Sequence, residues 1–149
     1  METPRHTIKE ARTIGSRKAL KCTLFVFLTL EAFILFLETR GDFANGIMFF
    51  IQGQKDSLFL SMIFILFLSS FFLGRWAGRK ILVEKKNHIL IAMLLALLTA
   101  GILISYFYLF AIIKRLITGD WKILTITISL VSLSIWIITT WSIGKMRPE

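Results

Sequence analysis

Long apolar runs alternate with short charged segments along this chain. Residues 89–113 contain no charged side chain over 25 positions, and residues 123–144 contain none over 22. Uncharged runs of about 18 residues or more are typical of membrane-spanning helices. The pattern predicts an all-α integral membrane protein, a single membrane domain over 1–149 with spans at about 22–38, 58–74, 89–113 and 123–144. Because the connections between spans are short, we expect an antiparallel four-helix bundle.

Two segments outside the spans also carry helical signals. Residues 1–21 form a basic segment, predicted to be cytoplasmic, in which Thr7 and Glu10 have the capping-box spacing that begins a helix. That helix either lies on the inner membrane face or extends the first span. Asp42 precedes an apolar stretch too short to span, which predicts a short interfacial helix in the first outer loop. A re-entrant element lining a cavity is the alternative.

The distribution of Lys and Arg predicts the orientation. Six basic residues lie in the amino-terminal segment, five between the second and third spans and two in the tail, against five in the other two loops. Under the positive-inside rule, this asymmetry places both termini in the cytoplasm. From the small size and simplicity of the chain we expect a bacterial inner membrane.

Composition excludes several classes of function. Hydrophobic residues make up 56% of the chain, more than in an ordinary soluble domain, and no soluble catalytic domain is expected. Cys22 is the only cysteine, and His6 and His88 lie in basic segments outside the apolar runs. These residues offer no cysteine-rich metal site and no bis-histidine site within the membrane, so we predict neither a metal nor a cofactor.

The net charge of +9 is concentrated beside the apolar spans. This placement favours a bilayer with anionic headgroups as the partner and argues against nucleic acid. Arg75 and Arg79 lie one helical turn apart and are candidates to clamp a lipid phosphate, with Lys80 beside them. Snorkelling to ordinary headgroups is the alternative for these side chains.

Glu31 is the candidate for intramembrane function. It lies ten residues beyond Lys21, which at 1.5 Å per residue places it about 15 Å into the bilayer. An acid at this depth costs a few kcal/mol, so we expect it to face the bundle and to be protonated or partnered. It is either a proton- or cation-coupling site or a hydrogen-bonding group that holds helices together.

Two groups of residues predict helix packing. Ala92, Ala96 and Ala100 form a small-residue ridge that permits close approach of a neighbouring helix. A polar stripe on the fourth span offers hydroxyl groups to Glu31 or to another helix, and it contains Thr125, Ser129, Ser132, Trp136 and Thr139.

The sequence supports two functions. Four spans with Glu31 inside the first resemble the small multidrug-resistance transporters, and this one-residue resemblance implies a coupling carboxylate; we assign no family. The first hypothesis is a non-enzymatic subunit or accessory and assembly factor that docks to itself or to a larger membrane protein. The alternative is a small homo-oligomeric transporter or channel that uses Glu31. We do not expect an enzyme, since no catalytic residues converge.

Overall fold

The computed structural model describes residues 7–114 and 121–146. This part of the chain is helical and contains no strand. The elements are α1 (Ile8–Thr39), α2 (Phe43–Gln54), α3 (Ser57–Gly78), the π-helical turn η1 (Arg79–Val83), α4 (His88–Lys114) and α5 (Trp121–Gly144). Four of the described helices are long and apolar enough to cross a membrane, which confirms the predicted all-α class and is compatible with a membrane protein. Four residues used in the sequence arguments, Arg5, His6, Arg115 and Arg147, lie outside the described residues.

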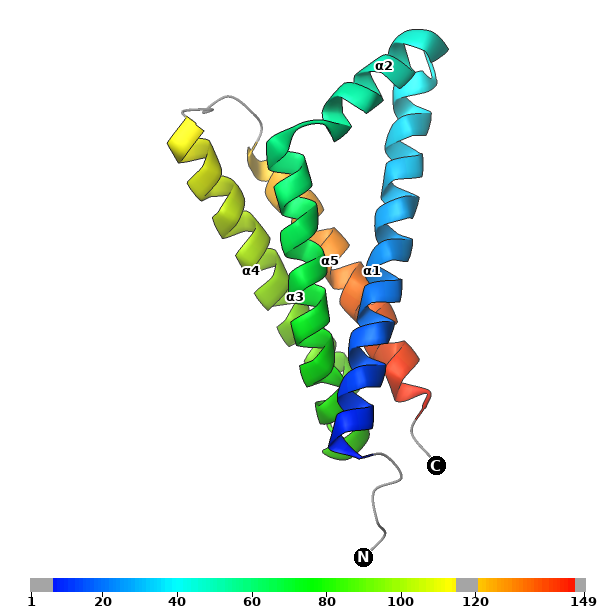
Figure 1. Ribbon diagram of the computed structural model, residues 1–149, viewed down its shortest axis with the longest axis vertical. Coiled ribbons are helices and arrows are strands. Elements are labelled where there is room, and N and C mark those ends of the chain that lie inside the picture. The colour runs from blue at the N-terminus through cyan, green and yellow to red at the C-terminus, as the bar shows by residue number, and fades with distance from the viewer. Residues whose placement is uncertain (1–6, 115–120, 147–149) are drawn as a thin grey trace, which may run out of the picture.

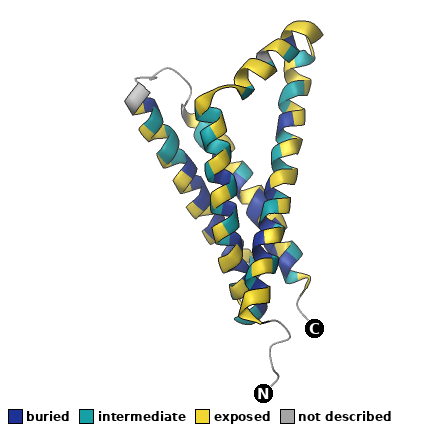
Figure 2. Cartoon of the chain, in the orientation of Figure 1, coloured by how far each residue is buried: buried dark blue, intermediate teal, exposed yellow. Residues whose placement is uncertain are grey.

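The helices α1, α3, α4 and α5 come together near the two chain ends and spread apart toward α2 (Figure 1). The closest partnerships are α1 with α3 and α4 with α5. Buried residues are concentrated in the half of the molecule near the chain ends, whereas the half of α1 next to α2 is largely exposed (Figure 2). The tight packing is therefore found at one end of the bundle.

The basic segment and the first span form one continuous helix. The Thr7 hydroxyl accepts a hydrogen bond from the Glu10 amide at 3.2 Å, and the Glu10 carboxylate accepts one from the Thr7 amide at 2.9 Å. These bonds confirm the predicted capping box and satisfy amides that have no partner within the helix. From this cap α1 runs without interruption for 32 residues, so the basic segment extends the first span.

The loop between the first and second spans contains the short helix that Asp42 predicts. The Asp42 carboxylate accepts hydrogen bonds from the Asn45 backbone amide at 3.3 Å and from the Asn45 side-chain amide at 2.7 Å. The 12-residue α2 that follows folds back against the end of α1. Gly46 makes this possible, because a Cβ at that position would lie 2.7 Å from the Glu38 carbonyl carbon.

The third helical element extends further than the apolar run 58–74 suggests. After Gly78 the backbone continues as the π-helical turn η1. Glu84 then forms ion pairs with Arg79, at 3.2 Å, and with Lys80. These pairs hold the two cations against their own helix. Lys85 follows with a φ of 52°, in the left-handed region.

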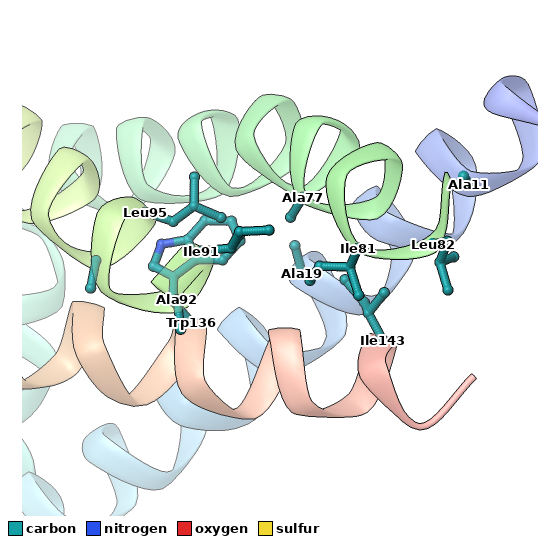
Figure 3. Close-up of a cluster of buried hydrophobic side chains, with 11 residues drawn as sticks. Ala11, Ala19, Ala77, Ile81, Leu82, Ile91, Ala92, Leu95, Trp136 and Ile143 are labelled. Carbon is teal, nitrogen blue, oxygen red and sulfur yellow. The ribbon is translucent and has the colours of Figure 1, made fainter. Parts of the chain in front are cut away.

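The core divides into two clusters. One lies near the chain ends and joins α1, α3, η1, α4 and α5 around the fully buried Trp136 (Figure 3). The other joins α3, α4 and α5 around Leu66, Leu103 and Ile135. The first cluster includes Ala11, Ile81 and Ile143, so the beginning of α1, the turn η1 and the end of α5 pack together.

Candidate functional site

The contact between α1 and α3 begins with a close approach of two backbones. A Cβ on Gly15 would lie 2.8 Å from the Gly78 Cα and closer still to the Gly74 carbonyl oxygen. A Cβ on Gly78 would lie 2.9 Å from the Gly15 Cα. Glycine is therefore required on both helices at this crossing. The sequence analysis missed this site, although its signals, Gly74-xxx-Gly78 and Ala11-xxx-Gly15-xxx-Ala19, are present in the chain.

Further along the same faces, the gap between α1 and α3 is filled by progressively larger side chains. The Thr23 hydroxyl donates a hydrogen bond of 2.9 Å to the Ser70 hydroxyl, and both side chains are fully buried. One turn later the Phe27 ring lies 6.4 Å from the Phe59 ring and 6.3 Å from the Phe67 ring, measured between centroids. The side chains thus match the increasing separation of the helices seen in Figure 1.

Glu31 continues this series at four-residue spacing after Thr23 and Phe27. Only 9% of the residue is exposed. Its Oε2 accepts a hydrogen bond from Nε2 of Gln54, the last residue of α2. We predicted partners among the hydroxyls of the fourth span, but the structure instead supplies the side-chain amide of Gln54 from α2. The reason is geometric, because α2 crosses from the end of α1 toward the beginning of α3 (Figure 1) and brings Gln54 within hydrogen-bonding distance of Glu31.

The alanine ridge of α4 lies in the interior. Ala92, Ala96 and Ala100 are 1%, 6% and 8% exposed. Ala92 and Leu95 lie against the indole ring of Trp136 from α5 (Figure 3). The indole Nε1 donates a hydrogen bond of 2.7 Å to the hydroxyl of Thr99, which is also fully buried. Small residues on α4 therefore leave room for the large ring, and Thr99, which our sequence analysis did not select, satisfies its polar atom.

The predicted polar stripe of α5 is divided between interior and surface. Ser132, Trp136 and Thr139 are fully buried, Thr125 is half-buried and Ser129 is exposed. The Ser129 hydroxyl donates to the Thr125 carbonyl of its own helix at 2.8 Å. Among the described residues, the Ser132 and Thr139 hydroxyl oxygens are buried without a hydrogen-bond partner. A packing role for the stripe remains a prediction.

The three predicted headgroup candidates are placed differently. Arg75 is exposed, with its guanidinium 5.7 Å from the centroid of the Phe71 ring. Arg79 and Lys80 instead pair with Glu84. The hydrogen bond from Lys80 lowers the pKa of Glu84, and the positive charges of Lys80, Arg79 and Lys86 act in the same direction against a smaller effect of burial. Arg75 is thus the candidate whose charge is not paired with Glu84.

The described residues contain no group of three or more His, Cys, Asp or Glu side chains placed to hold a metal ion. No family model matches the chain, and the comparisons with curated proteins and with solved structures likewise give no match. The fold defines the class as an all-helical protein with four candidate membrane-spanning helices. The function must be argued from the arrangement of its residues.

Proposed function

We propose that this protein is a non-enzymatic subunit or accessory factor of a membrane complex, built as an antiparallel four-span bundle with both termini in the cytoplasm. It docks to a larger membrane protein or to another copy of itself. The observation that carries the proposal is the hydrogen bond between Glu31 and Gln54. It gives the deep carboxyl group a role in holding the outer helix α2 on the bundle.

The orientation is supported by the clustering of three basic segments. Ala11 in the amino-terminal segment, Ile81 in the central basic segment and Ile143 near the carboxyl-terminal tail belong to one buried cluster. Two of these segments carry six and five basic residues, so the positive-inside rule assigns this end to the cytoplasm. Labelling with a membrane-impermeant thiol reagent tests the assignment in a Cys22→Ser background. Lys55→Cys should be labelled from outside and Lys86→Cys only after permeabilisation; the reverse pattern overturns it.

Assembly is supported over transport by the surroundings of Glu31. A coupling carboxylate requires a polar path, yet one turn before Glu31 on the same helix the ring of Phe27 lies near the rings of Phe59 and Phe67 on α3. Its hydrogen bond comes from an amide of the same chain. The other three spans, at 58–74, 89–113 and 123–144, contain no acidic or basic side chain. This environment suits a residue that fixes one helix on another.

Helix α2, which the hydrogen bond from Gln54 to Glu31 holds on the bundle, presents an apolar surface. Phe43, Met48 and Ile51 of α2 are 71%, 59% and 46% exposed, and Phe33 and Phe36 on the neighbouring half of α1 are 57% and 63% exposed. Within the most apolar window of α1, only 11% of the residues are buried by the rest of the chain. Membrane helices associate through packing and hydrogen bonds, and we propose that this half of α1 together with α2 receives the partner.

Affinity purification in native lipid particles, followed by mass analysis, tests the proposal. We expect recovery of a stoichiometric membrane protein, either a different chain or a second copy. Glu31→Gln keeps a hydrogen-bonding group next to Gln54 and should preserve this recovery, whereas Glu31→Ala should reduce it. The matched control is Glu38→Ala, which removes an exposed carboxyl group about two helical turns further along α1.

The alternative function, a transporter or channel, makes the opposite prediction for the conservative variant. Glu31→Gln removes the ionisable proton and should abolish pH-dependent flux in liposomes. Recovery of the chain as a homo-oligomer, with flux that depends on the ionisable Glu31, would overturn the assembly proposal.

A further inference from the structure

An open pocket of about 310 Å³ lies where the beginning of α4 meets the end of α5. Its lining includes His88, Trp141, Gly144 and Lys145. The two helix ends lie side by side, since a Cβ on Gly144 would be in ordinary van der Waals contact with the Cγ of the His88 ring, at 3.7 Å. The pocket therefore lies at the end of the bundle where the two chain termini are found (Figure 1).

Three side chains of this pocket carry hydrogen-bond donors. The Lys145 ammonium group lies 3.6 Å from the centroid of the Trp141 ring, so the ring holds the cation in place by a cation–π contact. A lysine ammonium carries three N–H donors, and the His88 ring and the Trp141 indole each carry at least one. In the described part of the chain, the ion pairs join the Glu84 carboxylate to Arg79 and to Lys80. Within residues 7–114 and 121–146, neither Lys145 nor His88 forms an ion pair, so their donors can bind a ligand.

Phosphate is the acidic group whose chemistry suits these donors. Its oxygens accept several hydrogen bonds at once, and lysine binds it as a point charge. Tryptophan near the end of a span is typical of the headgroup level of a bilayer, where lipid phosphates lie. We propose that the pocket formed by His88, Trp141 and Lys145 binds a phosphate group, with an anionic lipid headgroup as its source. This site is separate from the predicted candidates Arg75, Arg79 and Lys80 on α3 and η1.

Reconstitution of the full chain in vesicles of equal phosphatidylglycerol and phosphatidylcholine, followed by native mass spectrometry, tests the site. We expect the protein to retain phosphatidylglycerol preferentially. Lys145→Gln should reduce this retention roughly fivefold, the effect of removing one cation near a charged membrane surface. His88→Gln should also reduce it, and Lys145→Arg should preserve it. Circular dichroism of each variant verifies that the helices remain folded.

Arg17→Gln is the matched control, because it removes an exposed cation on α1 near the same end of the bundle. Unchanged retention in this variant supports a defined pocket. Equal losses in Arg17→Gln and Lys145→Gln would instead show attraction to overall charge and overturn the proposal, as would full retention in the double variant of His88 and Lys145.

Titration with inorganic phosphate in pure phosphatidylcholine discs distinguishes the two sources of the ligand. Competition between phosphate and phosphatidylglycerol that depends on Lys145 supports the phosphate chemistry and extends it to the free ion. Retained phosphatidylglycerol that phosphate does not displace supports the lipid as the ligand. The assembly proposal does not depend on either outcome, because it concerns α2 and the opposite end of α1.

Discussion

Trp136 of α5 donates its indole N–H to the hydroxyl of Thr99 on α4 at 2.7 Å, and both side chains are fully buried. The indole has a single donor and no acceptor, so Thr99 satisfies its entire hydrogen-bonding requirement. The bond joins α4 and α5. In the most apolar segment of these helices, 39% and 33% of the residues are buried, a larger share than in the other two spans. It fixes the relative position of α4 and α5 at the centre of the core.

Thr99→Val should destabilise the protein by about 1 kcal/mol, because it keeps the shape of the side chain and leaves the buried indole N–H without an acceptor. Thr99→Ser keeps the hydroxyl group and should be affected less. The free energy of unfolding, measured by titration with a denaturing detergent in mixed micelles, gives the comparison. If valine and serine have the same effect, the bond does not stabilise the fold.

Gly15→Ala should separate α1 from α3. The added methyl group would overlap backbone atoms of Gly74 and Gly78, and a backbone cannot move aside as a flexible side chain can. We expect a loss of about 1–3 kcal/mol, the usual range for overpacking. The same unfolding titration measures it.

Gly101→Ala provides the control for that substitution. Gly101 lies in α4, and a Cβ added there would have no atom within 4 Å. An alanine at this position therefore meets open space and gains helix propensity. Its stability should be unchanged or slightly higher. Similar losses at Gly15 and Gly101 would contradict the close backbone contact.

Glu84 should make stability depend on pH. Its pKa is lowered in the folded protein by the hydrogen bond from Lys80 and by the neighbouring positive charges. The ionised carboxylate therefore stabilises the fold above the ordinary carboxyl pKa, and this contribution is lost as the pH falls through the lowered value. Thermal unfolding should show Glu84→Gln less stable than the wild type at neutral pH, with the difference disappearing on acidification. Glu38→Gln, at an exposed carboxyl group, should show a smaller difference.

Lys85→Gly should stabilise the protein. Lys85 has a φ of 52°, and a side chain in the left-handed region costs about 1 kcal/mol that glycine avoids. The gain is reduced by the greater freedom of glycine in the unfolded chain, so we expect a few tenths of a kcal/mol. Lys85→Ala removes the same charge but retains a Cβ. If alanine stabilises as much as glycine, charge and not backbone conformation is the cause.

Local features of the sequence were sufficient for the helical class and for several helix boundaries. The four apolar runs correspond to four helices able to span a membrane. The caps at Thr7 and Asp42 join groups only three positions apart, so their spacing alone revealed them. The extension of helix beyond residue 74 was not evident, since charged residues begin directly after Gly74 and the apolar run ends there.

The pairing of distant residues was decided by the tertiary structure. Glu31 was identified from its depth, but its partner Gln54 is 23 positions away and reaches it because α2 crosses from the end of α1 toward the beginning of α3. Thr23 and Ser70 are 47 positions apart, and Thr99 and Trp136 are 37 apart. Runs and caps follow from neighbouring residues along one helix, so the sequence by itself determined them. Which faces meet depends on how glycine and alanine let helices cross, and only the folded arrangement of all the helices fixes that.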